Sequence, residues 1–554
     1  MKIAVNIPPG IDLDDTTFLT GQSAWADVAN VRFWRGQPQT IGGWQRLVVN
    51  ALSGICRKVF SWTDNSGQIN IGFGTHSNLQ VWLAGVLYDI TPSAFVPGNI
   101  NGLAGLGWGT GAYGEGEYGE STSEVDYPMT WSLDTYGQNL IATPRGQTIF
   151  QWTNNTGTPA APITNAPANV TCSVVTTTRQ IMACGCNDVE TGTFNPRCIR
   201  FSDIENPTQW TAEIDNAAGE FILDCDGIIK CARLIGNYVA IWTDDGLYLG
   251  QYDPTTNASG EVNGWTFPQI GEKCGIIGVN AGVVLSEQIA YWMGSNGQFY
   301  EYNLGGAPQI IPSPIQADVF ANIVPAQADK IMCSSCAEFG EIRWDYPDVR
   351  DPAAPIYLFD SQGAVLLDQN NQPLEQPLES NNFENSRFVT YSTGGNLSPI
   401  GSYQRLNTIW SRGFMCRTAY VDAGPVPYPV GVDNMALAYY HELGQSADGA
   451  AFDAYAETAD FYASENVEQV LKIRGIWPDV QSQVGTVNLT VKTRLYPQDP
   501  NLRIKGPFLL TPGRPKKDFL ATGRIVRFRY ESTSAPMFWR IGQPVYDAID
   551  AGLR

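Results

Sequence analysis

The stretch YVAIWTDDGLYLGQY, from Tyr238 to Tyr252, contains the pattern that decides the fold of this chain. Two runs of β-branched, aromatic and apolar residues flank the turn sequence Asp244-Asp245-Gly246. A glycine at this position can adopt the positive φ that a tight hairpin turn needs. We therefore expect two antiparallel strands joined by a turn at Gly246.

The same pattern recurs along the chain at a spacing of about 50 residues. QNLIATPRGQTIFQW has its turn at Gly146 and QIAYWMGSNGQFYEY at Gly297, which are 100 residues before and 51 residues after Gly246. Looser copies are expected at residues 68–82, at residues 180–203, and as a split hairpin of residues 341–346 with 387–391. A lone hairpin is marginally stable in water, so six such units must bury their faces on one another. The repeat predicts an all-β protein with a six-bladed β-propeller.

The composition agrees with this fold class and predicts further domains. The chain has 554 residues with 56 Gly, 35 Pro and only 16% charged residues, which is typical of turn-rich β-proteins and too long for one core. We expect an extended N-terminal arm at residues 1–50, the propeller at 51–420 and a C-terminal β-sandwich or barrel, the platform, at 421–554. Insertions are expected at 102–120 and 349–385, and a short helix at 315–324.

Charge is distributed unevenly along the chain. The formal net charge is −21, but residues 501–554 hold ten Lys and Arg against four Asp and Glu, a net of +6, which leaves −27 on the rest. An acidic body disfavours ordinary nucleic-acid binding and suits a surface that DNA passes without sticking. The eleven cysteines follow no disulfide framework, and neither a signal peptide nor an apolar run of 18 residues is present. These features predict synthesis in a reducing cytoplasm and no membrane span.

Two motifs resemble the sequences of cofactor-binding or metal-binding sites. The insertion contains G-x-G-x-x-G at Gly109, Gly111 and Gly114, but neighbouring glutamates would repel a pyrophosphate, so we expect a loop and no cofactor. The C-x-C at Cys184 and Cys186 should place both thiols on one strand face. The chain has only two histidines, and therefore buried thiols are expected here rather than a zinc site.

The carboxylates and nucleophiles of the sequence form no recognised catalytic motif. No G-x-S-x-G or H-E-x-x-H motif occurs. The adjacent pairs Asp244-Asp245 and Asp14-Asp15 lie where turns are expected, so a propeller glycosidase is an alternative and solvated turn carboxylates are the expectation. We expect no enzyme activity and no catalytic residues.

One basic concentration is a candidate binding surface. Its basic residues lie in the last part of the chain, where arginines alternate with apolar residues. They could form a solvated strand face or a docking surface for an acidic partner, such as the acidic body of a neighbouring copy. Its members are Arg524, Arg527, Arg529, Lys516 and Lys517.

Several segments in order resemble the tail-nozzle, or packaged-DNA-stabilisation, proteins of short-tailed bacteriophages. The opening SAWADVANVRFWRGQPQTIGGWQRL and the insertion WGTGAYGEGEYG are similar to that family. So are EIRWDYPD, IWSRGFMCRTAYVD, LAYYHELGQSADGAAFDAYAET and IWPDV, and finally GRIVRFRYES with FWRIGQPVYDAIDAGLR. The resemblance spans nearly the full length, is weakest at residues 172–196, and departs from the family at the insertion 349–385.

The resemblance implies a structural protein of the virion tail, assembled in the host cytoplasm. Six copies would form a ring below the portal and adaptor, with the arm packed on the platform domain. Double-stranded DNA would be retained by this ring and pass through it without sequence-specific binding, and fibres or side proteins would attach to it. A receptor- or glycan-binding propeller adhesin is the alternative function.

Overall fold

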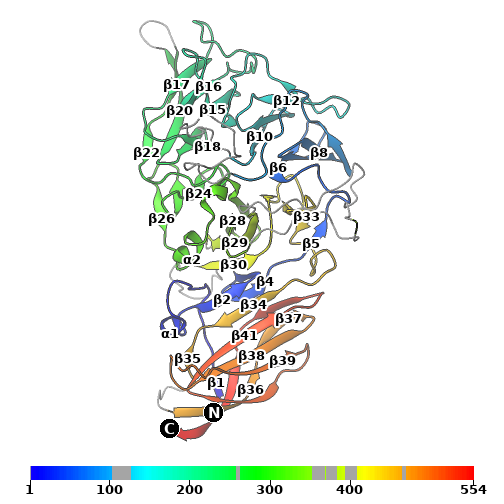
Figure 1. Cartoon of the computed structure of the whole chain (residues 1–554), viewed down its shortest axis with the longest axis vertical. Coiled ribbons are helices and arrows are strands. Elements are labelled where there is room, and N and C mark those ends of the chain that lie inside the picture. The colour runs from blue at the N-terminus through cyan, green and yellow to red at the C-terminus, as the bar shows by residue number, and fades with distance from the viewer. Residues whose placement is uncertain are drawn as a thin grey trace.

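The computed structural model of the chain describes residues 2–102, 127–256, 262–351, 369, 383–393, 409–463 and 469–553. Within these residues the chain forms ten β-sheets, two short α-helices and one 3-10 helix. Seven sheets form one body and three form a second body that carries both chain ends (Figure 1). Nearly all of the glycine-rich insertion and most of the insertion at 349–385 lie outside the described residues.

Four blades of the first body follow one another along the chain, each an antiparallel sheet built in chain order. Blade 1 comprises β6 (Cys56–Thr63), β7 (Ile69–Thr75), β8 (Leu79–Leu83) and β9 (Val86–Asp89). Blade 2 comprises β10 (Trp131–Tyr136), β11 (Asn139–Pro144), β12 (Phe150–Trp152) and β13 (Ala161–Pro162). Blade 3 comprises β14 (Cys172–Val175), β15 (Ile181–Asn187), β16 (Phe194–Phe201) and β17 (Gly219–Ile222). Blade 4 comprises β18 (Ile229–Ile235), β19 (Tyr238–Thr243), β20 (Leu247–Thr256) and β21 (Val262–Thr266), with β22 (Gln269–Gly271) also on β20.

Three further blades complete the body. Blade 5 comprises β23 (Gly282–Leu285), β24 (Ile289–Met293), β25 (Phe299–Asn303) and β26 (Gln309–Ile311). Blade 6 comprises β27 (Met332–Cys336), β28 (Glu341–Pro347), β29 (Asn385–Ser392) and β30 (Trp410–Phe414). Blade 7 combines β31 (Ala419–Val421), β32 (Val430–Val432) and β33 (Ala438–His441) with β5 (Trp44–Arg46) from the N-terminal part of the chain.

The seven blades close into a ring, so the fold is a β-propeller, but the predicted number of six blades is wrong. The first strands of successive blades contact one another from β6 to β31, and β31 contacts β6 again. The missed blade lies at residues 419–441, which were expected at the end of the propeller and in the platform, and its outer strand comes from the predicted arm. Its middle strands, β32 and β33, pair locally but are only three and four residues long, so the segment lacks the longer apolar runs on which the repeat count depends.

The six predicted hairpins form the middle strands of blades 1 to 6. Gly146 and Gly297 occupy their turns with φ of 78° and 79°. Gly246 is not among the glycines of positive φ, so the expected turn conformation is wrong there. A Cβ at Gly246 would lie 2.7 Å from the carbonyl oxygen of Gly271, so close backbone approach explains this glycine instead.

Tryptophans join neighbouring blades. The indole N–H of Trp131 in blade 2 donates to Thr75 O in blade 1 at 2.7 Å. That of Trp344 in blade 6 donates to Ala281 O beside blade 5 at 3.2 Å. The rings of Trp242 and Trp292 meet edge to face at 5.6 Å between blades 4 and 5. The buried rings contribute large apolar area between blades, and the indole N–H groups of Trp131 and Trp344 add directed hydrogen bonds that fix one blade against the next.

The platform consists of three antiparallel sheets. The first has the order β1 (Lys2–Ala4), β43 (Val545–Leu553), β36 (Gln469–Trp477) and β40 (Lys517–Gly523). The second has β2 (Trp25–Ala29), β34 (Ala454–Thr458), β41 (Ile525–Ser532), β38 (Val487–Arg494) and β39 (Arg503–Leu510), with β35 (Phe461–Tyr462) beside β41. The third has β3 (Val31–Trp34), β4 (Gln37–Thr40), β42 (Phe538–Ile541) and β37 (Val480–Val484). Strands of the N-terminal segment thus enter every platform sheet.

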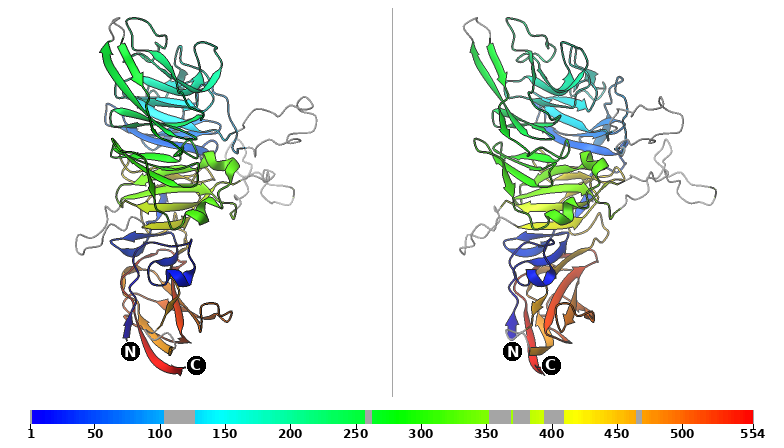
Figure 2. Two further views of the ribbon diagram at one scale, coloured as in Figure 1. Left: turned by 90° about the vertical axis from the view of Figure 1, so that its left-hand side faces the viewer. Right: turned by 60° about the vertical axis from the view of Figure 1, so that its left-hand side comes forward.

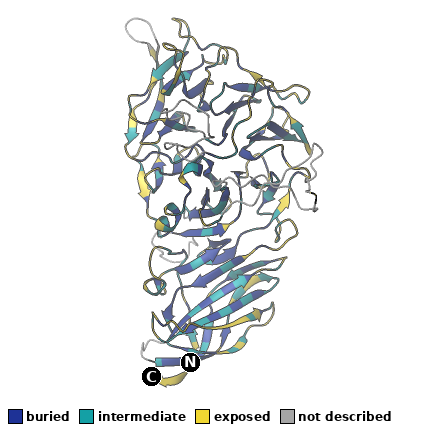
Figure 3. Cartoon of the chain, in the orientation of Figure 1, coloured by how far each residue is buried: buried dark blue, intermediate teal, exposed yellow. Residues whose placement is uncertain are grey.

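Platform and propeller share one apolar core. The alternation at Val487, Leu489 and Val491 buries these side chains as the sequence predicts. A single buried cluster includes Phe528 and Tyr530 of the platform together with Trp344 of blade 6. Buried residues, dark blue in Figure 3, occur in the strands of both bodies. Strands β2 and β3 contact β30, so the propeller rests on the platform through blade 6. Figure 2 shows the two bodies stacked end to end.

Helical structure is sparse in the described residues. The helix predicted at 315–324 is shorter and is α2 (Gln316–Phe320), followed by the 3-10 helix η1 (Pro325–Lys330), which begins at the proline expected to end it. Another short helix, α1 (Thr17–Thr20), is capped by Thr16, whose hydroxyl accepts from Leu19 N at 3.3 Å.

Candidate functional site

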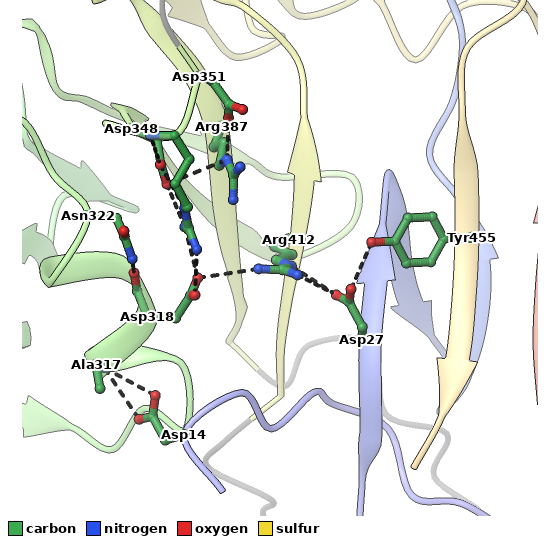
Figure 4. Close-up of polar contacts among 11 residues, drawn as sticks. Asp14, Asp27, Ala317, Asp318, Asn322, Asp348, Asp351, Arg387, Arg412 and Tyr455 are labelled. Atoms are coloured by element: carbon green, nitrogen blue, oxygen red, sulfur yellow. Dashed lines mark hydrogen bonds and ion pairs between the residues drawn. The ribbon is translucent and has the colours of Figure 1, made fainter. Parts of the chain in front are cut away.

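The joint between propeller and platform is centred on Arg412, which projects from β30 between two carboxylates (Figure 4). Its Nε donates to Asp27 Oδ1 on platform strand β2 at 2.9 Å. Its Nη1 donates to Asp318 Oδ2 on helix α2 at 3.3 Å. Burial lowers the pKa of Arg412, but Asp27 and the other anionic neighbours raise it more, so the net shift is upward. One cation therefore links a platform strand to the propeller.

The ion pairs continue into the propeller. Arg350 donates to Asp318 Oδ1 at 2.7 Å and to Asp348 Oδ2 at 2.6 Å. Arg387 pairs with Asp348 at 3.5 Å and with Asp351. The pKa of Asp318 is lowered, because Arg350 and the nearby arginines outweigh the burial that would raise it. The result is a chain of alternating charges that holds α2 and both ends of the blade 6 insertion against β30 (Figure 4).

The N-terminal arm adds backbone contacts to this joint. Ile11 N donates to Trp410 O at 3.1 Å, and Leu13 N donates to Pro314 O at 2.9 Å. The carboxylate of Asp14 accepts from Ala317 N at 3.2 Å. Asp14 therefore supports the start of α2. Asp244 likewise accepts from a backbone group, Ile228 N at 2.8 Å, as expected for a turn carboxylate.

Two of the predicted basic residues lie on the platform side of the same network. Arg529 donates to Glu457 Oε2 at 3.2 Å and stacks 3.6 Å from the ring of Tyr455, whose hydroxyl donates to Asp27 at 2.7 Å. Arg527 donates to Asp460 Oδ2 at 2.7 Å and to Glu457 Oε1 at 3.0 Å. Their charges are thus balanced by carboxylates of their own chain. The expected free basic face is not formed by this pair, and its place at an interface between copies stays a prediction.

The other predicted basic residues are not brought into this network. Lys516 pairs with Asp518 at 2.6 Å and lies 5.1 Å from the ring of Trp477. Lys517 is half-buried at the start of β40. Arg524 is half-buried between β40 and β41, and its Nε is buried without a hydrogen-bond partner. The five residues therefore occupy at least two separate places on the platform.

A second, largely buried ion cluster lies beside the joint and was missed from the sequence. Arg32 on β3 makes two hydrogen bonds with Glu442, at 2.6 and 2.9 Å, and pairs with Glu341 of blade 6 at 3.3 Å. Burial raises the pKa of Glu341 despite the attraction of Arg32. An adjoining cavity of about 20 Å³ is lined by these residues, with room for about one water molecule. Because Arg32 and its partners are hundreds of residues apart, no local pattern could reveal the cluster.

The helix η1 lies across one end of the propeller axis. Asp329 accepts from Arg145 of blade 2 at 2.8 Å and lies 3.6 Å from Lys230 of blade 4. Lys330 pairs at 2.9 Å with Glu384, which also receives two hydrogen bonds from Arg57 of blade 1. Burial lowers the pKa of Lys330 to about 8, whereas the two cations outweigh burial and lower the pKa of Glu384 to about 2. The Glu384 carboxylate thus pairs with both Lys330 and Arg57. Through these ion pairs η1 is connected to blades 1, 2 and 4.

The cysteines and histidines considered as possible metal ligands lie in apolar clusters or make hydrogen bonds within the fold. Gly185, with φ of 63°, interrupts the alternation of β15, so Cys184 and Cys186 join different apolar clusters and their predicted common face is wrong. His76 accepts a hydrogen bond from Ile55 N, and His441 accepts one from Arg417. Burial and nearby arginines lower the pKa of both imidazoles. Within the described ranges, no three His, Cys, Asp or Glu side chains are grouped to hold a metal ion.

Comparisons with known proteins add little beyond the fold. No family model and no curated protein matches the chain. Similar solved structures include BBS1N in complex with ARL6DN, at 11% identity and a TM-score of 0.33, covering 73% of this chain and 97% of that one. YCF48 bound to D1 peptide is similar at 8% identity and a TM-score of 0.36, covering 72% and 97%. Neither likeness is close enough to carry an argument about function.

The sheet order itself defines the class of the protein: a seven-bladed β-propeller on a three-sheet platform. In the described part of the chain, no helix has the length and apolar character to cross a membrane.

Proposed function

We propose that this chain is a structural protein of a bacteriophage virion that forms the nozzle of a short tail. Six copies assemble into a ring that retains packaged double-stranded DNA and lets it pass during ejection. The ring joins the portal and adaptor complex and carries fibres or side proteins. The chain acts without catalysis and is assembled in the host cytoplasm into the virion tail.

The observation that carries this proposal is where the family-like segments lie in the fold. VRFWRGQPQTIGGW supplies β3, β4 and the start of β5, and IWSRGFMCRTAYVD supplies β30 and β31. GRIVRFRYES and FWRIGQPVYDAI supply β41, β42 and most of β43. These segments build much of the platform, the joint strand β30 and two strands of blade 7, whereas the stretch of weakest resemblance lies in blade 3, far from that joint (Figure 1). Such a distribution supports a shared mode of assembly through the platform, with propeller tips free to differ.

The closed propeller axis supports a conduit formed between copies. Arg57, Glu384 and Lys330 fill one end of the axis with ion pairs, so duplex DNA has no path through a single propeller. A channel for DNA must then be enclosed by several chains. The acidic body of each copy would repel the phosphates on its way, so the duplex could slide without being trapped.

The platform also offers apolar surface for contacts between copies. Strand β39 lies at the edge of its sheet, and its Ile504 and Leu509 side chains are 59% and 47% exposed. Leu520 on edge strand β40 is 52% exposed. Exposed apolar residues on edge strands are typical of surfaces that become buried on association.

The test is the number of copies in solution and in the virion. We expect native mass spectrometry and electron microscopy of the purified chain to give a six-membered ring with the platforms inside. The double variant Ile504→Glu with Leu509→Glu should reduce ring yield at least ten-fold. Ile214→Glu, at a residue that is 89% exposed in blade 3, is the matched control and should leave the ring intact.

Two outcomes would contradict the proposal. A trimer on the virion, with no role in DNA retention, would favour the alternative of a receptor- or glycan-binding adhesin. Equal loss of assembly in the blade 3 control would remove the platform from its proposed role.

A further inference from the structure

The propeller axis contains two cations that share one neutral partner. Lys58 on β6 of blade 1 lies with its Nζ 3.4 Å from Asn280 Oδ1, beside blade 5. Arg233 on β18 of blade 4 donates from Nη2 to the same oxygen at 3.0 Å. Because blades 1 and 5 are not neighbours in the ring, Lys58 reaches across the axis to meet Arg233.

Neither cation has a carboxylate within 4 Å among the described residues. The carboxylate of Asp134 on β10 interacts electrostatically with both Lys58 and Arg233 from beyond ion-pair distance, and its oxygens accept from the backbone N–H groups of Thr135 and Val175, both at 2.8 Å. Arg233 donates otherwise only to backbone carbonyls, at 3.0 Å to Ala232 and 3.5 Å to Val279. The cations of the neighbouring ion clusters at η1, by contrast, each pair with a carboxylate, so Lys58 and Arg233 differ from the other described cations of the axis.

We propose that Lys58 and Arg233 bind a small oxyanion of the size of sulfate or phosphate on the propeller axis beside Asn280. Two like charges that approach one another away from bulk water are unfavourable unless an anion compensates them. Arginine offers a planar set of donors to such an anion and lysine a compact charge, and the Asn280 carboxamide supplies a further N–H donor. The ligand class is therefore a tetrahedral dianion, and the site goes beyond the proposed role in the tail.

The protonation of Lys58 makes this binding depend on pH. Burial, followed by the charge of Arg233, lowers the pKa of Lys58 to about 7. Cys231, Asp134 and Cys333 also face this ammonium group and act in the opposite direction, but more weakly. Below pH 7 the ammonium group is charged and attracts the anion, and above pH 7 the charge is lost.

The test is isothermal titration of the full chain with sodium sulfate at constant ionic strength. Sulfate stays dianionic from pH 6 to pH 9, so only the protein titrates. We expect one saturable site at pH 6, with an affinity that falls more than ten-fold by pH 9. Lys58→Met should weaken binding at least ten-fold at pH 6, and Lys58→Arg should retain it and lose the pH dependence. Lys505→Met, at an exposed lysine of β39, is the control and should bind as the unmodified chain does.

Circular dichroism would confirm that each variant is folded. Absence of saturable binding to the unmodified chain at pH 6 would overturn the proposal, as would equal binding by folded Lys58→Met. If Lys58→Met does not fold, the unmodified chain and Lys58→Arg decide: an affinity independent of pH in the former refutes the site.

Discussion

Arg412 is expected to be the residue whose removal most weakens the joint between propeller and platform. Arg412→Met keeps the length of the side chain but leaves Asp27 and Asp318 without their shared cation. The Arg412 side chain is 13% exposed, and its partners are 24% and 22% exposed, so the pairs are neither fully buried nor freely solvated. Hydrogen bonds between charged groups contribute about 1.5 to 3 kcal/mol when shielded from water. In the variant, Tyr455 still donates a hydrogen bond to Asp27 and Arg350 still donates one to Asp318, which limits the loss of stability.

We expect Arg412→Met to lower the free energy of unfolding by about 2 to 3 kcal/mol at pH 7, measured by urea unfolding with tryptophan fluorescence. A double-mutant cycle with Asp27→Asn should give a coupling energy of about 1 to 2 kcal/mol. Arg474→Met is the matched control, because Arg474 is 49% exposed and has one partner, Asp547 at 2.9 Å. This exposed pair should contribute about 0 to 1 kcal/mol. Equal losses in the two variants, or a coupling energy below about 0.5 kcal/mol, would refute the role given to Arg412.

Two further predictions concern the propeller axis and a blade turn. Glu384→Gln should lower the free energy of unfolding by about 3 kcal/mol at pH 6, because the pKa of Glu384 is lowered from 4.5 to about 2 in the folded chain. The stabilisation by the ionised carboxylate is complete above pH 4.5 and is lost as the pH falls towards 2. Urea unfolding at pH 6 and pH 3 should therefore show a smaller cost at pH 3, and Glu531→Gln, at a 30% exposed side chain, should cost under about 1 kcal/mol. Gly275→Ala should cost about 3 kcal/mol or prevent folding, because its Cβ would lie 2.1 Å from Asp244 O. Gly424→Ala, with no atom within 4 Å of its Cβ, should change the free energy of unfolding by no more than about 0.5 kcal/mol. Equal effects of the two substitutions would contradict this reasoning.

The sequence was most informative where strands and their turn lie close together along the chain. Gly146 and Gly297 marked two hairpins, because a tight turn imposes a local backbone requirement. The outer strand of blade 7 could not be predicted, because β5 and β33 are nearly 400 residues apart and pair only in the folded chain. The same holds for the joint, where Asp27 meets Arg412 across 385 residues. A sequence pattern reveals contacts between residues that are close in the chain. The pairing of β5 with β33 and of Asp27 with Arg412 joins distant residues and therefore produces no such pattern.

The internal pairing of Arg527 shows a second limit of sequence reasoning. A run of alternating arginines indicated a solvated or docking face, since its own strand contains few acids. The balancing carboxylates, Glu457 and Asp460, come from other parts of the second platform sheet and its edge. Net charge by segment therefore overstated how much positive charge the platform presents.

The pairing of the two chain ends has a consequence for synthesis on the ribosome. Strand β1 pairs with β43 and β5 pairs with β33, so these early strands remain without partners until segments hundreds of residues later in the chain have been made. At translation rates of about 5 to 20 residues per second, that interval is on the order of a minute. A prematurely terminated chain could form several blades but could complete neither blade 7 nor the first platform sheet. Only full-length copies would then present a finished platform, so incomplete products would be kept out of any assembly built on it.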